Sequence, residues 1–284
     1  MSKENGKEEE LVFNIGDVIN GYKLVEKIDE GGFGQVFKCT KDNAVFAMKL
    51  ESNSQDGGSA IKLEMSVLTR LNHIPVFPTF YNGGRRRRYH YLVLELLGDN
   101  LKMLKSKSPN PEALSDGTWS RVGIQCLYAL KKMHDNGFVH RDIKPSNFAV
   151  GFNTSNEVRS RRILLFDFGL ARRFVRSEMI RVQDSPKVSV RNIKSKTKTA
   201  VPAPKASRKN KNQPGSQNNF KTKLALKPPK EGDNPNVKKE KKFTYRVARP
   251  HTDFRGTHQY ASPNAHTQIE LGRHDDIWSL MYMV

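Results

Sequence analysis

A short segment in the middle of the chain, HRDIKPSN at residues 140–147, places a carboxylate, an ammonium group and an amide close together, as Asp142, Lys144 and Asn147. Asp167 follows 25 positions after Asp142, within an Asp-Phe-Gly sequence. Carboxylate and amide oxygens are ligands that Mg²⁺ prefers. Phosphoryl transfer needs phosphates held in place, metal ions that neutralise charge, and a carboxylate beside the attacking hydroxyl. The spacing therefore predicts this chemistry.

Two charged residues upstream extend the set. Lys49 ends a predicted strand, and Glu64 lies on the next predicted helix, where its carboxylate can pair with Lys49. Taken alone, a Lys–Glu pair is more often a solvated ion pair of small energetic value. A glycine-rich segment at 29–36 is, by itself, equally consistent with a simple hairpin turn. Both features gain weight from the downstream residues.

The elements that must position these residues begin with strands. Between Tyr22 and Leu50, three apolar, β-branched and aromatic runs are separated by turn signals, which predicts an antiparallel meander. Apolar residues at helical spacing predict a helix over 59–71, and two further strands are expected within 77–84 and 89–97. Five strands and one helix would form a small lobe, which we assign to residues 21–98.

After Gly98 the pattern becomes helical, with a short helix near 101–104 and a long amphipathic helix near 115–136. The apolar residues of the long helix that we expect to face a core are Trp119, Val122, Cys126, Leu127, Leu130 and Met133. Residues 99–175 would begin a larger, mainly helical lobe that carries the polar loops. The fold class is therefore α+β with two lobes.

Charge is concentrated in one part of the chain. Residues 181–242 hold 18 Lys or Arg against 4 acidic residues, a net +14 of the chain's +20. Their Lys, Asn, Ser and Pro content predicts a disordered basic insertion over 176–243, flanked by 244–284, which continues the second lobe. Residues 1–20 read as a disordered lead-in. The chain stops at Val284 inside an apolar segment, so we expect the second lobe to be truncated.

Composition also bears on location. No apolar run is long enough to span a bilayer, and the N-terminal segment is charged. The two cysteines, Cys39 and Cys126, suit a reducing compartment and are expected to be buried thiols. We therefore expect a cytoplasmic protein without a membrane partner. Four lysines within 238–242 resemble a nuclear import signal, which would add a nuclear location.

The catalytic-loop segment, the Asp-Phe-Gly sequence and the lysine at the strand end resemble the protein kinase family in order and spacing. The resemblance implies that Asp142 orients the substrate hydroxyl and that Lys144 steadies the γ-phosphate. It also implies that Asn147 and Asp167 hold Mg²⁺. A lysine two positions after the catalytic aspartate is the serine/threonine pattern, so the expected partner is a protein with a Ser or Thr acceptor.

An ATP site follows from the same resemblance. Lys49 would hold the α- and β-phosphates, positioned by Glu64. The other residues that the resemblance places around the nucleotide are Gly31, Gly32, Phe33, Gly34, Val36, Ala47, Glu95 and Leu97. Asp29 replaces the first glycine of the usual nucleotide loop, and a carboxylate there would weaken ATP binding.

The segments 254–264 and 272–280 resemble the casein kinase I superfamily, particularly its tau-tubulin kinase branch, where Ala-Ser-x-Asn stands in place of Ala-Pro-Glu. This resemblance implies that Thr257 braces Asp142 and Lys144. It also implies that Asp276 anchors the catalytic loop.

Three functions remain open from the sequence. The first is an active kinase with acidic, pre-phosphorylated or cytoskeletal substrates, of which Arg246 and Arg249, beside the substrate-binding end, would favour the acidic or pre-phosphorylated ones. The second is a catalytically weak pseudokinase scaffold, suggested by Asp29, by the truncation, and by the basic insertion that interrupts the activation segment between Gly169 and Gly256. The third is binding of an acidic protein or another polyanion through the basic insertion.

Overall fold

The computed structural model of the protein describes residues 11–31, 34–53, 59–111, 114–152, 157–181 and 239–284. The chain divides into two units, one formed by 1–176 with 243–284 and the other by 177–242. The first unit contains every residue of the candidate site and is described below. The predicted nucleotide-loop residues Gly32 and Phe33 lie outside the described residues.

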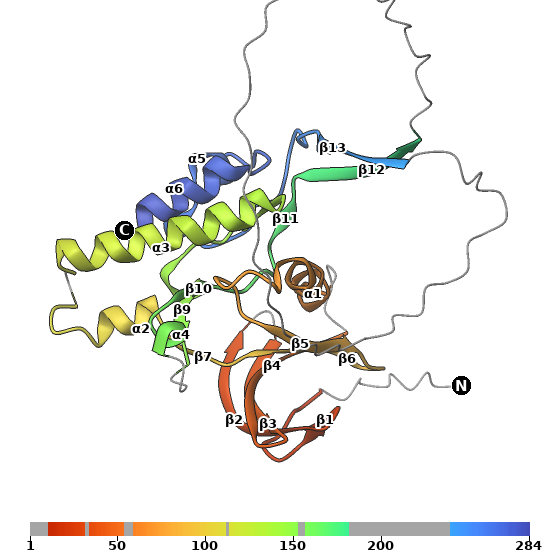
Figure 1. Cartoon of the computed structure of the whole chain (residues 1–284), viewed down its shortest axis with the longest axis vertical. Helices are drawn as coiled ribbons and strands as arrows, with labels where there is room; N and C mark the ends of the chain where they lie inside the picture. The colour runs from red at the N-terminus through yellow and green to blue at the C-terminus, as the bar shows by residue number, and fades with distance from the viewer. Residues whose placement is uncertain (1–10, 32–33, 54–58, 112–113, 153–156, 182–238) are drawn as a thin grey trace, which may run out of the picture. The chain divides into compact units, whose positions relative to one another are not determined.

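A six-stranded antiparallel sheet forms the N-terminal part of this unit (Figure 1). In spatial order its strands are β1 (Val18–Ile19), β2 (Tyr22–Gly31), β3 (Gly34–Lys41), β4 (Ala44–Ser52), β6 (Tyr89–Glu95) and β5 (Phe80–Arg85). The meander and the two later strands are therefore confirmed. Apolar residues on one face, among them Leu24, Phe37 and Met48, form a separate small core.

The sheet has one strand more than the five that were predicted. β1 pairs with β2 through Ile19 and Tyr22, and both side chains are buried. Phe13 packs edge to face on Tyr89, with ring centroids 5.1 Å apart. The prediction of a disordered lead-in was therefore wrong for residues 11–20, because these two apolar contacts fix the segment to the sheet.

Helix α1 (Ala60–Leu71) is the helix predicted after the meander, and it carries Glu64. The Ser59 side chain caps it by accepting a hydrogen bond from the Lys62 N–H. The buried carboxylate of Glu51, on β4, accepts from the Ala60 and Ile61 N–H groups at 3.2 and 2.8 Å. The helix therefore begins directly against the strand that carries Lys49.

The C-terminal part of the unit is built on two longer helices, α3 (Asp116–Asp135) and α6 (Arg273–Met283), which lie side by side in Figure 1. The short helices are α2 (Leu101–Ser106), α4 (Glu157–Ser160) and α5 (Pro263–His266). Cys126, Leu130 and Met133 are fully buried on α3, as predicted. Trp119 and Leu127 are 44 and 48 % exposed, so their predicted burial was wrong, because only one narrow stripe of α3 packs on the core.

Short strands between these helices carry the polar loops. β7 (Leu97–Asn100), β9 (Phe148–Gly151) and β10 (Ile163–Leu165) form an antiparallel sheet with β9 in the centre. β8 (Phe138–Val139) pairs with β11 (Arg172–Arg173). The main core lies between α1, α3 and these strands, and it includes Phe77, Phe148 and Phe168.

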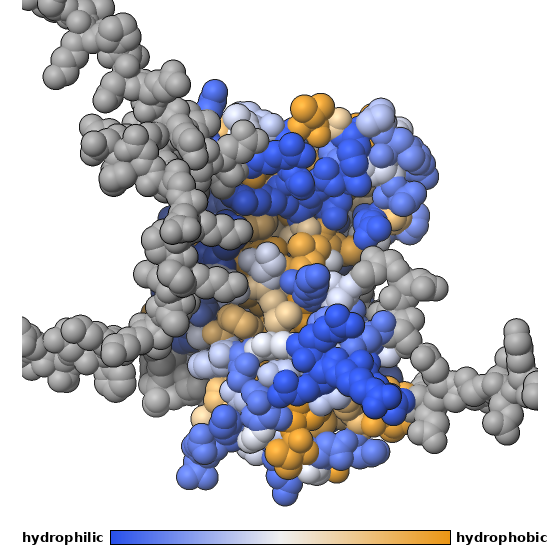
Figure 2. Space-filling model, turned by 90° about the vertical axis from the view of Figure 1, so that its right-hand side faces the viewer, coloured by the Kyte–Doolittle hydropathy of each residue, from blue (hydrophilic) through white to orange (hydrophobic). Residues whose placement is uncertain are grey.

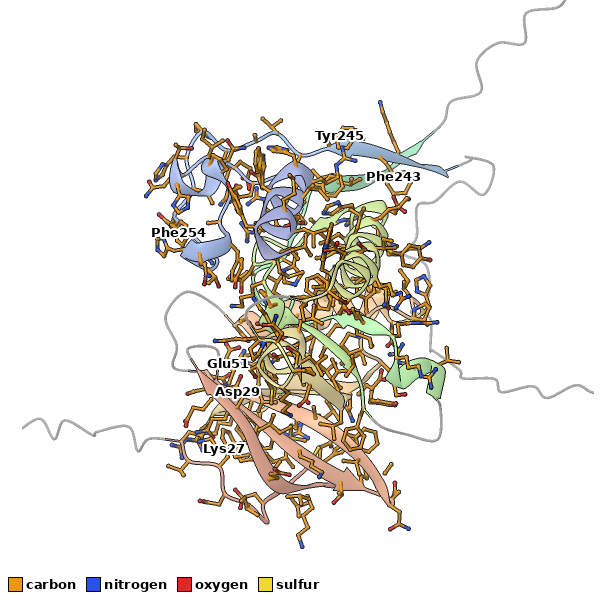
Figure 3. All side chains as sticks on the ribbon, turned by 90° about the vertical axis from the view of Figure 1, so that its left-hand side faces the viewer. Lys27, Asp29, Glu51, Phe243, Tyr245 and Phe254 are labelled. Carbon is orange, nitrogen blue, oxygen red and sulfur yellow. The ribbon has the colours of Figure 1, made fainter. Side chains whose placement is uncertain are left out.

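The two ends of the predicted insertion are strands. β12 (Val175–Arg181) and β13 (Lys239–Tyr245) form a two-stranded sheet, and Figure 3 shows Phe243 and Tyr245 on β13. Disorder was therefore the wrong prediction for 176–181 and 239–243. The remainder of the insertion, 182–238, lies outside the described residues.

The surface is strongly hydrophilic over large areas. On the face drawn in Figure 2, two hydrophilic areas are separated by a region in which more hydrophobic residues gather. Among the described residues, no helix is both long and apolar enough to cross a membrane.

Candidate active site

The catalytic-loop segment lies between β8 and β9 and is fixed from α6. The Asp276 carboxylate is 1 % exposed and accepts hydrogen bonds from the N–H groups of His140 and Arg141, both at 2.8 Å. Its Oδ2 also lies 2.8 Å from Nε2 of His134, on α3. Arg141 has a φ of +70°, in the left-handed region that non-glycine residues rarely adopt. Asp276 thus holds the loop in the strained backbone conformation that precedes Asp142.

The Asp142 carboxylate is buried and is contacted by the side chains of Thr257 and Lys144. The Thr257 hydroxyl donates to Oδ1 at 2.8 Å, and the Lys144 ammonium lies 2.8 Å from Oδ2. Lys144 also donates to the Thr257 hydroxyl at 3.0 Å. The structure therefore brings Asp142, Lys144 and Thr257 into one triangle, although Thr257 is 115 positions from Asp142.

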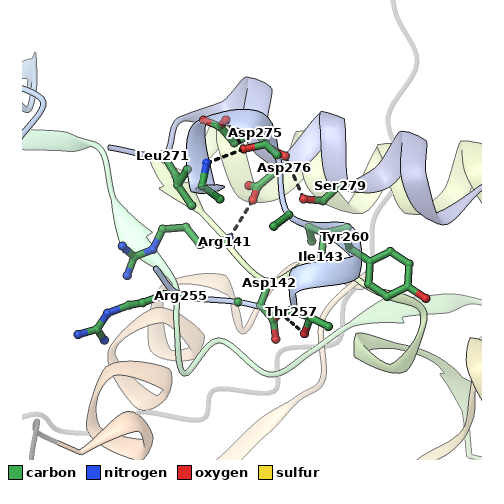
Figure 4. A pocket seen from close by; sticks show the side chains of 14 residues that line it. Arg141, Asp142, Ile143, Arg255, Thr257, Tyr260, Leu271, Asp275, Asp276 and Ser279 are labelled. Carbon is green, nitrogen blue, oxygen red and sulfur yellow. Dashed lines mark hydrogen bonds between the residues drawn. The ribbon is translucent and has the colours of Figure 1, made fainter. Parts of the chain in front are cut away.

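Figure 4 shows Asp142 and Thr257 at the edge of a pocket between the catalytic loop, the segment that contains Thr257, and α6. The Asp142–Thr257 hydrogen bond lies on one side of the pocket and the Asp276–Arg141 hydrogen bond on another. The Ser262 hydroxyl, shortly after Thr257, donates to the Asp275 carboxylate of α6 at 2.6 Å, so the catalytic loop and the Thr257 segment are anchored to the same helix.

Asn147 is oriented by Asp142. Its Nδ2 donates to the Asp142 carbonyl at 2.8 Å and to the Asp142 Oδ2 at 3.2 Å. Because the amide nitrogen has both partners, the Asn147 side-chain oxygen faces away from them as an acceptor. A buried amide oxygen held in this way suits a hard cation.

Lys49 joins two carboxylates from distant parts of the chain. Its Nζ lies 3.0 Å from Oε2 of Glu64 and 2.8 Å from Oδ1 of Asp167. The other Glu64 oxygen accepts from the Phe168 N–H at 3.3 Å. The strand, the helix and the Asp-Phe-Gly segment are thus connected through one ammonium group.

Burial and charge act in opposite directions on these groups. Burial alone would lower the pKa of Lys49, but the charges of Glu64 and Asp167 outweigh it and raise that pKa. Burial raises the pKa of Glu64, against the opposing effect of Lys49. Burial would also raise the pKa of Asp167, yet Lys49 reverses this and lowers it. Lys49 is therefore charged, and Asp167 is held as a carboxylate.

His140 and Phe168 have packing roles. Both side chains are fully buried, and Phe168 packs edge to face on His140 and on Phe77. His140 Nδ1 accepts from the Asp142 N–H at 3.3 Å, while Nε2 lies 3.1 Å from the Phe166 carbonyl. This pattern fits the neutral imidazole with its proton on Nε2. The imidazole therefore supports the loop through the main chain of Asp142 and makes no use of the Asp142 carboxylate.

The glycine-rich segment joins β2 and β3, with Gly31 and Gly34 paired at the end of the ladder. Gly34 has a φ of +105°, and a Cβ atom there would lie 2.0 Å from the Leu50 carbonyl oxygen. The turn therefore packs closely on β4, the strand that carries Ala47 and Lys49. Val36 lies opposite Lys49 in the β3–β4 register.

Asp29 is exposed on β2, two positions before Gly31 (Figure 3). Its Oδ1 accepts a hydrogen bond from the N–H of its neighbour, Glu30, at 2.9 Å. The predicted weakening of ATP binding by this carboxylate stays a prediction.

Glu95 ends β6, and Leu97 begins β7, so both lie on the connection between the six-stranded sheet and the C-terminal part. The Glu95 carboxylate is bound by Arg159 and by Thr79. The side chain is thus engaged within the protein, and the Glu95 N–H donates to the Thr79 carbonyl at 2.9 Å.

Three residues of the site were not identified from the sequence. Glu51 caps α1, His134 contacts Asp276, and Arg159 binds Glu95. His134 and Arg159 are 142 and 64 positions from their partners, so no local pattern marks them. Glu51 had a weak signal, since it is an acidic residue on a predicted strand shortly before a predicted helix.

The side chains present fit a magnesium–nucleotide complex. Asn147 offers an amide oxygen and Asp167 a carboxylate, both hard oxygen donors that suit Mg²⁺. Within the described ranges, no group of three or more His, Cys, Asp or Glu is placed to hold a metal ion. A protein contribution of one or two ligands is usual where phosphates and water complete the magnesium shell.

The protein thus has an N-terminal part made of a sheet and helix α1, and a C-terminal part that is mainly helical. Together with the loops that carry Asp142 and Asp167, this arrangement is that of a two-lobed, ATP-dependent phosphotransferase. The chain belongs to the protein kinase family, since the family model described as the protein kinase domain matches residues 22–200. The α+β, two-lobed kinase fold is thereby confirmed. A protein kinase domain uses ATP and a divalent metal and acts on protein substrates.

Named relatives place the chain in the serine/threonine group, in the casein kinase I and tau-tubulin kinase branch. A serine/threonine-protein kinase of Dictyostelium discoideum is 32 % identical over 96 % of this chain and 42 % of its own length. A protein of Caenorhabditis elegans named as an inactive tau-tubulin kinase is 32 % identical over 78 % of this chain and 57 % of its own length. A protein of the same organism named as a casein kinase I is 35 % identical over 55 % of this chain and 46 % of its own length. The matches thus span about half of each relative's length.

Proposed function

We propose that this protein is an active serine/threonine kinase that transfers the γ-phosphoryl group of ATP to Ser or Thr hydroxyls of protein substrates. The observation that carries the proposal is the pair of connected clusters, one around Lys49 and one around Asp142. An assembled pair of clusters is what phosphoryl transfer requires, because positioning and charge stabilisation supply most of its catalysis.

Each cluster has a distinct task. The Asp142 carboxylate orients the acceptor hydroxyl and takes up its proton, and Thr257 fixes the carboxylate through Oδ1. Lys144 is held beside it and can offer positive charge to the transferred group. Lys49, braced by Glu64, binds the nucleotide phosphates. Asn147 and Asp167 would hold Mg²⁺, which supplies charge neutralisation between the phosphates when bound.

A comparison with Asp142→Asn tests the activity. The wild-type chain should phosphorylate a mixed Ser/Thr peptide substrate in the presence of Mg-ATP, and the variant should lose almost all of this rate. The amide keeps the shape of the side chain and removes the charge that accepts the proton. Equal rates for the two proteins would refute the proposal.

A preference for acidic or phosphorylated substrates is supported by a cluster of arginines around Glu270. Arg172 and Arg249 each contact the Glu270 carboxylate, at 3.1 and 2.6 Å. Burial and the nearby charge of Arg172 lower the pKa of Arg141 to about 10, which leaves it cationic at neutral pH. The single carboxylate of Glu270 therefore lies among several arginines, so this cluster carries a net positive charge.

The two arginines that the sequence singled out differ in their surroundings. Arg249 is engaged by Glu270, whereas the Arg246 guanidinium donates to the Arg173 carbonyl at 3.4 Å and is exposed. We propose that Arg246 and the cationic excess around Glu270 favour acidic residues near the acceptor. Equal kcat/KM values for acidic and neutral peptides of the same length would contradict this preference.

A second candidate function is a catalytically weak scaffold. Two observations favour it: the related tau-tubulin kinase that is named inactive, and Asp29 in the nucleotide segment. This alternative requires that Mg-ATP binding produces no phosphotransfer even in a single turnover. A burst of phosphopeptide, absent from Asp142→Asn, would eliminate it.

A further inference from the structure

Arg159 forms a dense set of contacts outside both catalytic clusters. Its Nε donates to Oε1 of Glu95 at 2.8 Å, and its Nη2 contacts Oε2 of the same carboxylate. Nη2 also donates to the Phe77 carbonyl at 3.1 Å, and Nη1 contacts the Pro75 carbonyl. The guanidinium therefore bridges two separate chain segments with the fork geometry that only arginine provides.

Glu95 is held from its other side as well. Its Oε2 accepts from the Thr79 N–H at 3.0 Å and from the Thr79 hydroxyl at 3.2 Å. Burial would raise the pKa of Glu95, but the hydrogen bonds and charge of Arg159, together with Thr79, lower it. Both charged side chains are more than four-fifths buried. A buried pair with several hydrogen bonds fixes geometry more firmly than an exposed one.

The position of Arg159 is set by the C-terminal part of the unit. It lies on α4, which packs on β9, and a Cβ atom on Gly151 of β9 would come within 2.3 Å of the Arg159 carbonyl oxygen. Only glycine allows this approach. Gly151 in turn pairs with Leu97 on β7. The main chain of Arg159 thus packs directly against the same small sheet that receives the chain after Glu95.

The contacted carbonyls belong to the N-terminal part. Pro75 and Phe77 lie on the connection between α1 and β5, and Phe77 packs on Phe168 with ring centroids 5.7 Å apart. Arg159 therefore reaches from the C-terminal part to the connection that supports the Asp-Phe-Gly phenylalanine. It also binds Glu95, the last residue of β6, from which the chain passes to the C-terminal part.

We propose that Arg159 is a positioning residue that fixes the crossing segment at Glu95–Leu97 and thereby sets the affinity for the adenine nucleotide. The inference rests on the proposed kinase function, because it concerns the same nucleotide site. In the structure, the Arg159–Glu95 pair is formed at the same time as the contacts of Lys49 with Glu64 and Asp167, which is the arrangement that we propose binds the nucleotide. Release of the crossing segment should therefore weaken nucleotide binding without removing the catalytic groups.

The test compares Arg159→Ala, Arg159→Lys and Glu95→Gln with the wild type in binding of Mg-ADP by titration calorimetry. We expect the dissociation constant of Arg159→Ala to rise by about tenfold, since a small displacement of a positioned site is costly. Arg159→Lys should show an intermediate loss, because an ammonium cannot reproduce the forked contacts. KM for ATP should rise in parallel while kcat changes by less than about twofold.

The matched control is Arg121→Ala, which removes an exposed arginine of α3. It should leave both binding and thermal unfolding unchanged. The double variant Arg159→Ala/Glu95→Gln should lose less Mg-ADP affinity than the two single losses added together, because the two substitutions share the Arg159–Glu95 interaction. If Arg159→Ala does not fold, the Mg-ADP dissociation constants of Arg159→Lys and Glu95→Gln test the inference in its place.

Two results would overturn the inference. One is an unchanged dissociation constant in folded Arg159 variants. The other is a higher kcat, which would make the pair a restraint on activity. If the wild type binds Mg-ADP but phosphorylates no faster than Asp142→Asn, the kinase proposal fails and the binding comparison still judges Arg159.

Discussion

At the scale of single residues, the Asp142 carboxylate depends on a hydroxyl from a distant segment. Thr257 donates to Asp142 and accepts from Lys144, so one small side chain orders both charged groups. A hydroxyl can do both because it is donor and acceptor at once. The loss of this group should therefore affect catalysis more than nucleotide binding.

We expect Thr257→Ala to lower kcat by about tenfold or more, the scale of one lost hydrogen bond to a charged group. The dissociation constant for Mg-ADP should stay within about twofold, since the Thr257 hydroxyl acts on Asp142 and Lys144, whereas Lys49 is braced by Glu64 and Asp167. Thr257→Ser keeps the hydroxyl and should retain most of the activity. Steady-state kinetics and calorimetry on the three proteins check this, and equal losses in both variants would argue against the hydroxyl.

Glu64 should show a conflict between stability and activity. Burial raises the pKa of this carboxyl, so ionisation is less favourable in the folded chain than in the unfolded chain. A raised pKa means that the stability contribution is present below the ordinary value of 4.5 and is lost as pH rises through the raised value. Glu64→Gln lacks this titration.

The free energy of unfolding of the wild type relative to Glu64→Gln should therefore be greatest at acid pH and fall as pH increases. Urea unfolding at several pH values between about 4.5 and 8 measures the difference. The Gln variant should also lose at least about tenfold in kcat/KM, because Lys49 loses one of its two carboxylates. A difference that does not change with pH would mean that the Glu64 pKa is not raised.

At the scale of elements, the sequence predicted what depends on local pattern. The helix that carries Glu64, the meander that carries Lys49 and the spacing from Asp142 to Asn147 are local, and the structure has them where they were expected. The Thr257–Asp142 and Asp276–loop contacts came only through family resemblance. Arg159 and His134 were missed, because their partners are set by tertiary packing that no periodicity encodes.

The long helix α3 illustrates the limit of periodicity. Its apolar residues at steps of three and four outnumber the positions that touch the core, so Trp119 and Leu127 were assigned to the interior wrongly. β1 was missed for the opposite reason, since a strand of two residues has too little pattern to detect. In both cases the error concerns which other elements a segment packs against, and this depends on the fold and not on the local sequence pattern.

The β2–β3 turn provides a prediction with a matched pair of glycines. Gly34 has a positive φ and would place a Cβ against the Leu50 carbonyl, whereas nothing lies within 4 Å of a Cβ at Gly31. Gly34→Ala should reduce the free energy of unfolding by about 2 kcal/mol or more, from backbone strain plus the clash. Gly31→Ala should change it by less than about 0.5 kcal/mol. Denaturant unfolding measures both, and similar effects at the two positions would contradict the geometry.

At the scale of the whole molecule, charge is divided unevenly along the chain. Residues 181–242 carry a net +14, and the other residues together carry +6. Phe220 is the one aromatic residue in that segment, so bases have little on which to stack. We propose that the segment binds polyanions without sequence preference, and that its lysines at 238–242 support nuclear entry.

Such binding should depend steeply on salt. Each phosphate contact releases counterions, and several contacts together cost about a thousandfold in affinity between roughly 50 and 200 mM salt. We expect the full chain to bind duplex DNA, single-stranded DNA and heparin with similar slopes of log K against log salt. Fluorescence anisotropy with labelled probes at four salt concentrations measures these slopes.

The matched variant lacks residues 182–238, which carry most of the excess charge and lie outside the described elements. It should keep its melting temperature and its Mg-ADP affinity, because every residue of the two catalytic clusters remains. Its affinity for each probe should fall to the level expected from the mildly basic remainder. If the deletion leaves polyanion binding unchanged, the positive charge that matters lies on the kinase domain itself, and the arginines around Glu270 become the surface to test.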